Sequence, residues 1–593
     1  MCGLIATLTT SPAAGDGVRR ALARMQRRGP DGEGVWQGEG VCLGHRRLAI
    51  IDLDARAVQP MHSADGRYAI VFNGEIYNYR ELRDALIANG AALHTTSDTE
   101  VLLELFAREG EAMLPKLRGM FALVIWDKLA RCAFAARDAY GIKPLYLART
   151  RDGWLFASQV KALLATGLVD TAPDAQGQAG FWLLGSVPEP HTWYRDIRAV
   201  PAGAWCRIDA SGKLDGPHTW HDIGAAWRDA PACTVTRDDA QAQVRAAVLE
   251  SARKHLVADV PVGVFLSGGI DSGSLAGLMR DAGAAHIKGI TIAFAEFAGT
   301  HNDEAPIAAR IAQQYGIEHH IRTVSRAEFD ADLPRILDAM DQPSIDGINT
   351  WYAAKAVAEL GLKVVVSGVG GDELFCGYSN FHSIPTLVSC WRRAARLPFA
   401  HTLARAITHM QARRSGNPRW PWFTRTAGNL YGAYWLRRGL FSPDQLPALV
   451  GASADTQSCA ALDPAALIES IAGPLPRDPL AAIGLLESKA YLRNQILRDS
   501  DWASMDHSVE LRTPLVDAWL LRDLAPLLRG FGRLSGKTLL AHASATPLPP
   551  DIVHRRKTGF GIPVERWLRE TTHGAQAEGG SRSWARRVAS EFE

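Results

Sequence analysis

The chain has 593 residues, which is too many for one hydrophobic core and predicts two to four domains. Hydrophobic residues make up 47% of it and charged residues 22%, as is typical of a globular protein. Because 65 basic and 63 acidic residues nearly cancel, the net charge of +2 gives no indication of a nucleic-acid-binding surface.

The eight cysteines contain no CxxC pair, which argues against both a disulfide framework and a structural zinc site. The start of the chain lacks the basic and apolar regions of a signal peptide, and no run approaches eighteen apolar residues. We therefore expect a cytoplasmic protein with neither a nucleic-acid nor a membrane partner.

The first 160 residues are predicted to be β-rich with two helical inserts. Short apolar runs are separated by turn signals; they cover 41–43, 68–72, 121–126 and 132–135. Helical spacing marks 80–89, and Ser97 is a predicted N-cap, with Glu100 three residues later, for a helix through 108. A connector rich in Pro, Gly, Trp and Asp, with a few strands, follows from about 170 to 235.

From residue 238 the pattern alternates between helix and strand. Strands are predicted at 262–266, 287–294 and 363–367, and helices at 238–256, 272–281, 304–315 and 350–360. Such alternation predicts a parallel sheet with helices on both faces. Residues 385–480, rich in Arg, Trp, Leu and Ala, are predicted to be helical, either as a plain cap or as a surface for a partner or acceptor. The tail at 572–593 is predicted to be partly disordered.

Cys2 is the first candidate for chemistry. Removal of Met1 would leave Cys2 with a free α-amino group, whose reference pKa of about 8 suits it to take the thiol proton. One residue would then supply both nucleophile and base for attack on an amide carbon with release of ammonia. Taken alone, however, a small residue at a buried N-terminus is the more frequent explanation.

Nine segments, of which the first contains Cys2, decide between these two interpretations. They are MCGLIA, RRGPDGEG, LGHRRLAIIDL, QPM, FNGEIYNYRELR, TTSDTEVLL, LRGMFALVIWD, ARDAYGIKPLYL and FASQVKAL, in that order within residues 1–163. Together they resemble the class II glutamine amidotransferase domain, an α+β N-terminal-nucleophile fold with four αββα layers. The resemblance implies a glutaminase domain at 1–205, with the connector at 206–235.

The resemblance also assigns roles that physical chemistry supports. Arg47 and Asp98 would hold the α-carboxylate and α-ammonium of glutamine. Asn73 and Gly74 would form the oxyanion hole, and Glu75 would help to hold the substrate. Taken singly, each of these residues could equally belong to a turn or a surface ion pair.

Arg27 departs from the pattern of the amidotransferase domain. Similar proteins usually carry His at this position, directly before RGPD. We expect little effect on the chemistry, because this residue supports the loop and is not a reactant.

A second candidate site starts at VFLSGGIDSGSLAGL (264–278), a predicted buried strand, a Gly-bearing turn and a helix start. Backbone N–H groups of such a turn, together with a helix N-terminus, favour an anion. The spacing and the lack of Lys exclude a Walker-type P-loop. The segment instead resembles the SGGxDS loop of ATP pyrophosphatases, which cleave ATP between the α- and β-phosphates.

The segment VVVSGVGGDELFCGY (364–378) repeats this strand, glycine and acid order. Both loops should meet at the carboxyl edge of the parallel sheet, where Asp271 and Asp372 could hold Mg²⁺ on pyrophosphate. The resemblance implies ATP-binding residues Leu266, Ser267, Gly268, Gly269, Asp271, Ser272, Ile292, Ser367, Gly368 and Asp372. Lys557, in RRKTGFG, would be the late catalytic contact that stabilises charge during adenylate formation.

Both halves together resemble the glutamine-hydrolysing asparagine synthetase family, over roughly 1–380 and 485–570, with the synthetase domain at 236–593. The resemblance implies that Cys2 frees ammonia from glutamine. The second domain would use ATP to convert a carboxylate to an acyl-adenylate, and ammonia arriving through an apolar tunnel would give the amide, AMP and pyrophosphate. Aspartate is the first acceptor to expect. A homodimer is left open.

Val369 weakens the expectation of aspartate. In asparagine synthetases this position is often acidic, and Val can neither take a proton nor pair with a cation. A carboxylate on another small molecule, sugar or peptide is therefore the alternative acceptor. Two further alternatives are a sugar-phosphate or phosphoribosyl amidotransferase, which would not need the SGGIDS loop, and a catalytically silent scaffold, which would not need intact polar residues at both sites.

Overall fold

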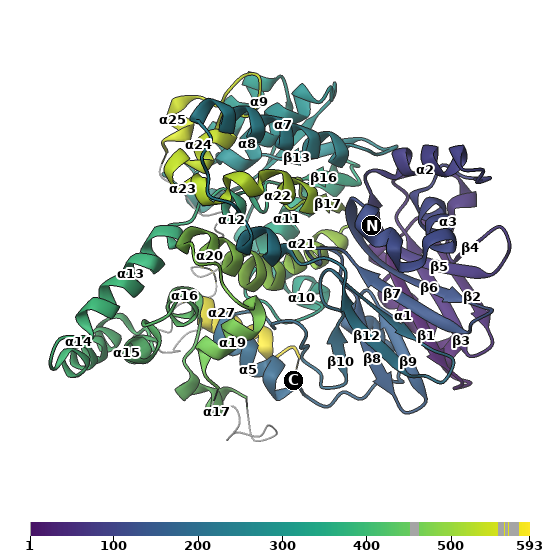
Figure 1. Ribbon diagram of the computed structural model, residues 1–593, viewed down its shortest axis with the longest axis horizontal. Helices are drawn as coiled ribbons and strands as arrows, with labels where there is room; N and C mark the ends of the chain where they lie inside the picture. Colours follow the sequence, from purple (N-terminus) through teal and green to yellow (C-terminus); the bar gives the residue numbers. More distant parts are fainter. Residues whose placement is uncertain (1, 451–461, 556–562, 564–566, 568–579, 593) are drawn as a thin grey trace.

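The computed structural model describes residues 2–450, 462–555, 563, 567 and 580–592. Figure 1 shows an all-antiparallel part at the N-terminal end of the chain and a helix-covered parallel sheet beside it. This arrangement confirms the fold class expected from the sequence.

Two six-stranded antiparallel sheets form the first part. The first has the order β10 (Ile197–Ala199), β8 (Tyr146–Thr150), β9 (Gly153–Ala157), β1 (Gly3–Thr9), β3 (Val41–Arg47) and β2 (Gly32–Gly38). The second has the order β12 (Leu214–Thr219), β11 (Ala204–Ile208), β7 (Cys132–Arg137), β6 (Gly119–Asp127), β5 (Tyr68–Ile76) and β4 (Met61–His62). Part of the connector expected at 206–235 thus contributes strand residues to the second sheet.

Strand alternation explains how the two sheets pack face to face. In β1, Leu4 and Leu8 join the core shared with the second sheet, whereas Ile5 points to the opposite side, against α1 (Ala14–Arg24). Two helices cover each outer face: α1 and α4 (Val160–Ala165) on the first sheet, α2 (Tyr79–Ala88) and α3 (Asp98–Glu109) on the second. The four αββα layers follow.

The N-cap predicted at Ser97 is confirmed. Its side chain accepts a hydrogen bond from the backbone N–H of Thr99 at 3.1 Å, and α3 starts at Asp98. The Glu100 carboxylate, however, accepts from the backbone of Thr95 at 2.6 Å and of His94 at 2.8 Å, and so fixes the segment that leads into the helix.

A five-stranded parallel sheet organises the second part. Its order is β15 (Glu318–Val324), β14 (Lys288–Phe294), β13 (Val262–Phe265), β16 (Val364–Val366) and β17 (Glu510–Arg512). The helices packed on its two faces include α7 (Arg237–His255), α8 (Ile270–Asp281) and α9 (Ala305–Tyr315), and α10 (Arg326–Ala339) and α11 (Ile348–Glu359). The expected parallel sheet is confirmed, and β17 joins it from far along the chain.

Further helices complete this part. They are α5 (Ala175–Leu184), α6 (Ile223–Arg228), α12 (Gly371–Leu374), α16 (Leu430–Arg438), α17 (Leu446–Leu449), α19 (Pro464–Ala472), α20 (Pro479–Leu486), a π-helix (Glu487–Leu497), α21 (Arg498–Met505), α22 (Ala518–Leu524), α23 (Phe531–Leu534), α24 (Gly536–Ala541) and α25 (Pro550–Val553). None of the helices formed by described residues is long and apolar enough to cross a bilayer.

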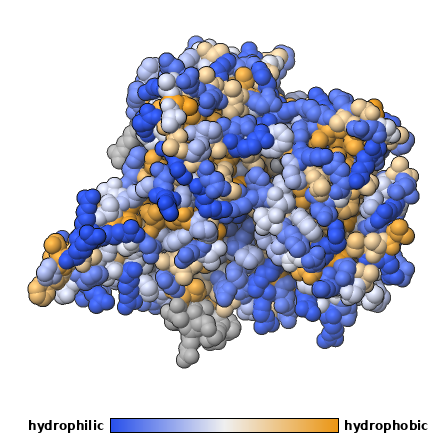
Figure 2. Space-filling model, in the orientation of Figure 1, coloured by the Kyte–Doolittle hydropathy of each residue, from blue (hydrophilic) through white to orange (hydrophobic). Residues whose placement is uncertain are grey.

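One pair of helices departs from the compact body. In Figure 1, α13 (Asn380–Ala394) and α14 (Ala400–Ser415) extend outward together, with the short α15 (Phe423–Thr426) beside α14. We call residues 380–426 the arm. Figure 2 shows apolar and strongly hydrophilic residues together on its surface.

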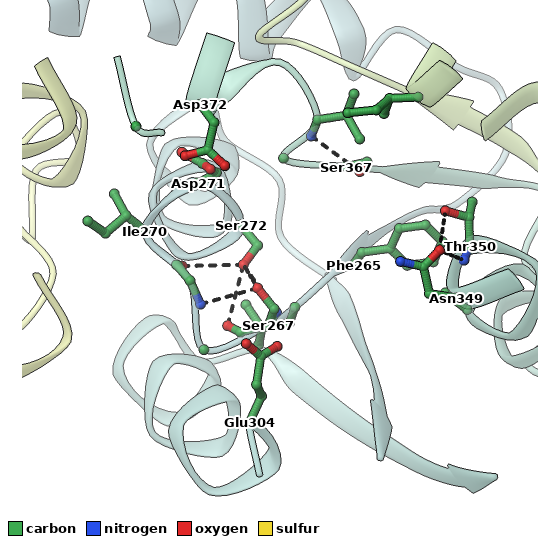
Figure 3. A pocket seen from close by; sticks show the side chains of 18 of the residues that line it. Phe265, Ser267, Ile270, Asp271, Ser272, Glu304, Asn349, Thr350, Ser367 and Asp372 are labelled. Atoms are coloured by element: carbon green, nitrogen blue, oxygen red, sulfur yellow. Dashed lines mark hydrogen bonds between the residues drawn. The ribbon is translucent and has the colours of Figure 1, made fainter. Parts of the chain in front are cut away.

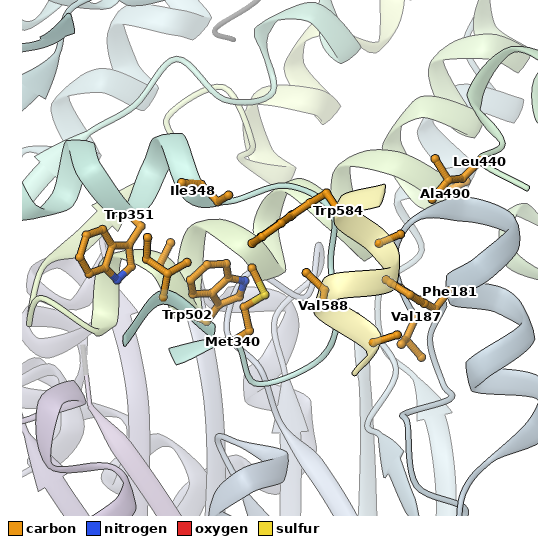
Figure 4. Packing of buried hydrophobic residues seen from close by; sticks show 14 of the residues in the cluster. Phe181, Val187, Met340, Ile348, Trp351, Leu440, Ala490, Trp502, Trp584 and Val588 are labelled. Carbon is orange, nitrogen blue, oxygen red and sulfur yellow. The ribbon is translucent and has the colours of Figure 1, made fainter. Parts of the chain in front are cut away.

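The tail at 572–593, expected to be partly disordered, contains a helix at residues 580–589. These form α27 (Gly580–Ala589), which buries Trp584 and Val588 completely or nearly so. Figure 4 shows both side chains directed into a cluster that contains Met340 and Trp502. Spaced four residues apart, the two side chains form one apolar helix face, whose burial outweighs the Gly- and charge-rich composition that suggested disorder. Residues 572–579 lie outside the described residues.

Candidate active sites

The first candidate site lies where β1 and β5 meet. The backbone N–H of Cys2 donates to Asn73 Oδ1 at 2.9 Å, and Cys2 Sγ lies 4.0 Å from the carbonyl oxygen of Leu48. The thiol is buried, and this burial raises its pKa. Cys2 and Asn73, predicted from positions far apart in the sequence, are therefore brought into direct contact.

Strand register places Arg47 beside Cys2. In the β1–β3 ladder Gly3 pairs with Arg46, so the chain on either side brings Cys2 next to Arg47. The Arg47 guanidinium donates to the carbonyl oxygens of Asp52 and, at 2.9 Å, of Asp54. These backbone contacts fix the orientation of the guanidinium.

Asp98, at the start of α3, contacts β5, the strand that carries Asn73. Its Oδ2 accepts a hydrogen bond of 3.1 Å from the backbone N–H of Ile76, the residue after Glu75 on β5. Burial raises the pKa of Asp98 to about 6. Asp52, which accepts from Arg47 through its carbonyl, also holds the backbone N–H of Thr96 through its carboxylate at 2.8 Å. This link joins the Arg47 loop to the segment that carries Asp98.

Gly74 has no room for a side chain. It pairs with Phe121 of β6, and a Cβ at this position would collide with the carbonyl oxygen of Met120. The close approach of the two strands, more than any turn, therefore requires glycine between Asn73 and Glu75.

Glu75 contacts the second part of the molecule. Its Oε2 lies 3.7 Å from Nη2 of Arg512, which is on β17 and fully buried. Arg512 also donates to Glu510 Oε1 at 2.6 Å and to the carbonyl oxygens of His255 and Val257 at 2.8 and 2.6 Å. The edge strand of the parallel sheet thus ends at the site of Cys2.

Glu75 and Glu510, the two acids that lie beside Arg512, differ in charge. Burial and the neighbouring Glu510 carboxylate raise the pKa of Glu75 well above its usual range. Burial would also raise the pKa of Glu510, but positive neighbours such as Arg512 and Lys143 outweigh it and lower that pKa. Glu75 is therefore the acid that keeps its proton, and Glu510 is the ionised partner of Arg512.

Arg27 and Arg28 bind the second part of the molecule, and Arg28 also contacts Cys2. Arg28 donates to the carbonyl oxygen of Cys2 at 3.0 Å and binds Asp501 of α21 with both nitrogens, at 2.7 and 3.1 Å. Arg27 pairs with Asp506 at 2.7 Å. Neither contact could be foreseen from the sequence, because both partners lie more than 470 positions away. The arginine at position 27, where similar proteins usually carry His, therefore forms an ion pair with the Asp506 carboxylate.

The second candidate site is a cavity of about 580 Å³ at the carboxyl edge of β13 and β16. Ten residues predicted to bind ATP line it: Leu266, Ser267, Gly268, Gly269, Asp271, Ser272, Ile292, Ser367, Gly368 and Asp372. The structure therefore brings the whole predicted set together around one hollow.

Serine hydroxyls fix the shape of the first loop. Ser267 Oγ and Ser272 Oγ are 2.9 Å apart, and the backbone N–H groups of Ser267 and Gly269 donate to Ser272 Oγ and Ser267 Oγ at 3.1 and 3.2 Å (Figure 3). The loop then enters α8 at Ile270, so the helix N-terminus is directed to the cavity.

The second loop touches the first. A Cβ on Gly368 would lie 2.8 Å from Cβ of Asp271 and 3.0 Å from the backbone nitrogen of Ser272, so only glycine fits. Figure 3 shows Asp271 and Asp372 next to each other at this junction. Val369 lines the cavity as well, and its backbone N–H donates to Ser367 Oγ at 3.4 Å.

Lys537, at the start of α24, is a cavity residue that the sequence analysis missed. Its Nζ forms ion pairs with Oδ1 of Asp271 and, at 2.8 Å, with Oδ1 of Asp372. Burial would lower the pKa of Lys537, but these two carboxylates outweigh it and raise the pKa. A single lysine in SGKTLL carries no local signal, because its importance depends on two loops far upstream.

The shared Lys537 contact tests whether a magnesium ion fits. Two carboxylates close enough to bind one ammonium can also bind one hard cation, although described residues offer no cluster of three or more His, Cys, Asp or Glu arranged for a metal. Asp271 and Asp372 therefore fit a magnesium ion, to which they would supply carboxylate oxygens. The predicted catalytic Lys557 lies outside the described residues.

Glu373 is a buried acid next to Asp372, directly behind the cavity lining. Burial raises its pKa to about 7, with Asp372 adding to the effect, while the hydroxyl of Tyr378 donates to its carboxylate at 2.8 Å. A group that titrates near neutral pH beside a phosphate loop is typical of a functional site.

Comparison with known proteins agrees with this arrangement. Residues 1–220 match the glutamine amidotransferase domain, and 243–589 match asparagine synthase. A putative glutamine-hydrolysing asparagine synthetase of Mycobacterium bovis is 33% identical over 96% of this chain and 88% of its own length. Glutamine-hydrolysing asparagine synthetase 1 of Bacillus subtilis is 30% identical over the same shares.

A third relative widens the range of activities in the comparison. The amidase chyE of Penicillium rubens is 32% identical over 62% of this chain and 56% of its own length. The two family matches, and the identity with full-length bacterial relatives, decide the assignment: the chain belongs to the glutamine-hydrolysing asparagine synthetase family and is a glutamine-dependent ligase.

Proposed function

We propose that the protein converts glutamine, ATP and a carboxylate, with aspartate as the first candidate, to an amide, glutamate, AMP and pyrophosphate. The observation that carries this proposal is the convergence of all ten predicted ATP-binding residues on one cavity, in a chain whose Cys2 contacts Asn73 elsewhere. Asp271 and Asp372 would hold Mg²⁺ on the pyrophosphate, and Lys557 remains the predicted late catalytic contact.

The first half-reaction would take place at Cys2. With Met1 removed, the backbone nitrogen that now donates to Asn73 would be the amine that accepts the thiol proton. The Asn73 side-chain amide and the Gly74 N–H would then stabilise the tetrahedral oxyanion. Arg47 and Asp98 would bind the two ends of the amino-acid part of glutamine, with Glu75 helping to hold the substrate from β5.

Transfer of ammonia would use the contact between the two parts. The Glu75–Arg512–Glu510 cluster is completely buried and joins β5 to β17, whose neighbour β16 ends at the second cavity. Because Glu75 keeps its proton while Glu510 pairs with Arg512, the cluster leaves little net charge near the path. A path of this kind would keep ammonia unprotonated until it reaches the adenylate.

A second acceptor class has an observation of its own. Val369 contributes an apolar surface to the cavity where asparagine synthetases often carry an acid. Without that acid, a carboxylate on a larger small molecule, sugar or peptide becomes the alternative acceptor. A silent scaffold is disfavoured by the complete polar sets at both sites. A cytoplasmic location and a homodimer remain predictions.

An acceptor screen tests the proposal. The chain would be incubated with glutamine, ATP, Mg²⁺ and one acid at a time, with aspartate first, and AMP and pyrophosphate measured. Cys2→Ala should abolish glutamine-dependent product yet keep product formation from ammonium salts, while Cys390→Ala, at an exposed position, should change neither. Glutamine hydrolysis by the Cys2→Ala protein would refute the nucleophile, and silence with every acid and both nitrogen sources would favour a scaffold.

A further inference from the structure

The arm carries a helix whose apolar face points outward. In α14, the side chains of Leu403, Ile407 and Met410 are 63%, 50% and 48% exposed, and Phe399 at its start is 84% exposed. Thr408 is the buried residue of this helix. The large side chains of α14 thus face solvent, whereas a small polar one faces the protein.

Helical spacing shows that this arrangement is systematic. Residues 399, 403, 407 and 410 follow one another at intervals of four and three, so they form a continuous stripe along α14. The half-buried Ala404 and Ala412 flank Thr408 on the other side. A surface helix of a globular protein normally has the opposite orientation, with its large apolar side chains turned to the core.

Charge in this region is equally one-sided. Residues 374–443 contain no Asp, Glu or Lys but ten arginines: Arg392, Arg393, Arg396, Arg405, Arg413, Arg414, Arg419, Arg425, Arg437 and Arg438. Because the whole chain has a net charge of only +2, the rest of it is net acidic. The positive charge is therefore concentrated in and beside the arm.

Exposed arginines lie at the end of the apolar stripe, where Arg413 and Arg414 follow Met410, and elsewhere on the same two helices. Arg405, Arg413 and Arg414 are exposed on α14 itself, and Arg392, Arg393 and Arg396 are exposed at the end of α13 that leads into it. Figure 2 shows blue and orange residues side by side on this projecting part. An outward apolar row bordered by arginines is the pattern of a helix that lies in a membrane interface.

Charge decides among the occupants of this surface. A second copy packed arm against arm would bring arginines against arginines, with no acidic residue in the segment to pair with them. A nucleic acid would bind the guanidinium groups but leave Leu403, Ile407 and Met410 in water. An anionic bilayer takes both features, because the aliphatic side chains enter the acyl boundary while the arginines reach lipid phosphates.

We propose that the arm docks on the surface of an anionic phospholipid bilayer, with α14 lying in the plane of the interface. The protein would bind peripherally, since no helix of the described residues can span a bilayer. The inference revises the expectation that the protein has no membrane partner. It is independent of the acceptor, because none of the arm residues it uses lines the nucleotide cavity.

Vesicle flotation with the full chain tests this proposal. The probes are vesicles of phosphatidylcholine alone and of phosphatidylcholine mixed with phosphatidylglycerol, at low and high salt. The protein should float with the anionic vesicles at low salt and stay behind with the neutral ones. Replacing three aliphatic side chains (Leu403→Gln, Ile407→Gln, Met410→Gln), or three arginines (Arg405→Glu, Arg413→Glu, Arg414→Glu), should each lower the bound fraction about tenfold or more.

Matched controls keep the result interpretable. Leu129→Gln with Ile321→Gln alters two residues that are 78% and 50% exposed outside the arm, and it should float like the parent. Glutaminase activity of every variant should stay at the parent level, which shows that the body is folded. The proposal is overturned if the parent does not float with anionic vesicles, if both arm variants float as it does, or if sedimentation shows a dimer that the aliphatic variant abolishes.

Discussion

The two candidate sites are built in contrasting ways. Around Cys2, the functional groups sit on or beside paired strands and are almost fully buried, so hydrogen bonds to the backbone and close strand packing determine their positions. Around Asp271 and Asp372, the groups come from loops at one sheet edge and surround an open cavity, and a lysine holds the two carboxylates together.

This difference explains which forces tune each site. In the first, desolvation is the largest influence on the pKa of Cys2, Asp98 and Glu75, and it raises all three. In the second, charge pairing overcomes desolvation at Lys537 and raises its pKa. Activity at the buried strand site should therefore depend on pH and on packing, whereas activity at the loop site should depend on the charges that surround it.

Breaking the buried contact that Arg512 makes between the two parts of the molecule should have the largest effect, a loss of stability. Arg512→Met removes the guanidinium that binds Glu510, Glu75 and two backbone carbonyls, and it leaves a buried carboxylate uncompensated. We expect a loss of about 3–5 kcal/mol of stability, measured as a lower thermal midpoint. Arg522→Met, whose side chain is 62% exposed, should leave the midpoint nearly unchanged. Equal midpoints for the two variants would mean that the cluster does not hold the parts together.

The strand site can be tested separately through Asn73. Asn73→Ala removes both the partner of the Cys2 nitrogen and the proposed oxyanion donor. Glutamine hydrolysis should fall by about 10²–10³-fold, while AMP formation from ammonium salts should persist. The exposed Asn302→Ala serves as control. A loss of both activities would show that the variant has damaged more than the first site.

The loop site should depend on Lys537. Lys537→Gln leaves Asp271 and Asp372 facing each other without the ammonium between them. Because a positive charge at developing phosphate charge stabilises the transition state, we expect pyrophosphate release to fall about a hundredfold with glutamine hydrolysis retained. Lys213→Gln, at an exposed position, should match the parent. Unchanged pyrophosphate release would remove Lys537 from the mechanism.

The smallest of these effects should be a pH dependence of glutamine hydrolysis at the strand site. Asp98 has a pKa of about 6, and only its ionised form pairs with the ammonium of glutamine. As pH falls from 7 to 5 the ionised fraction decreases, so kcat/KM for glutamine should drop about tenfold. Asp98→Asn should be slow at every pH and lack this step, whereas the exposed Asp84→Asn should keep it. A flat profile for the parent would contradict the role of Asp98.

The sequence was informative wherever chemistry and local structure coincide. The Ser97 cap, the strands around 68–72 and 121–126, and the SGGIDS turn into α8 all depend on residues close in sequence, and the structure has them as expected. The family resemblance supplied the ten cavity residues, and the rule that parallel strands present their carboxyl ends at one edge predicted that their two loops meet. Composition alone did not predict the helix at 580–589, where two buried side chains outweigh many polar neighbours.

By itself, then, the sequence determined the family and predicted the candidate site residues in each half, since motifs and hydrophobic periods are local properties of the chain. Only the tertiary structure decided that Arg512 meets Glu75, that Lys537 joins Asp271 to Asp372, and that α14 turns its aliphatic side outward. Each of these depends on segments far apart in sequence, or on which face of a helix the body covers. No local pattern encodes such pairings, because they follow from how complete elements pack together.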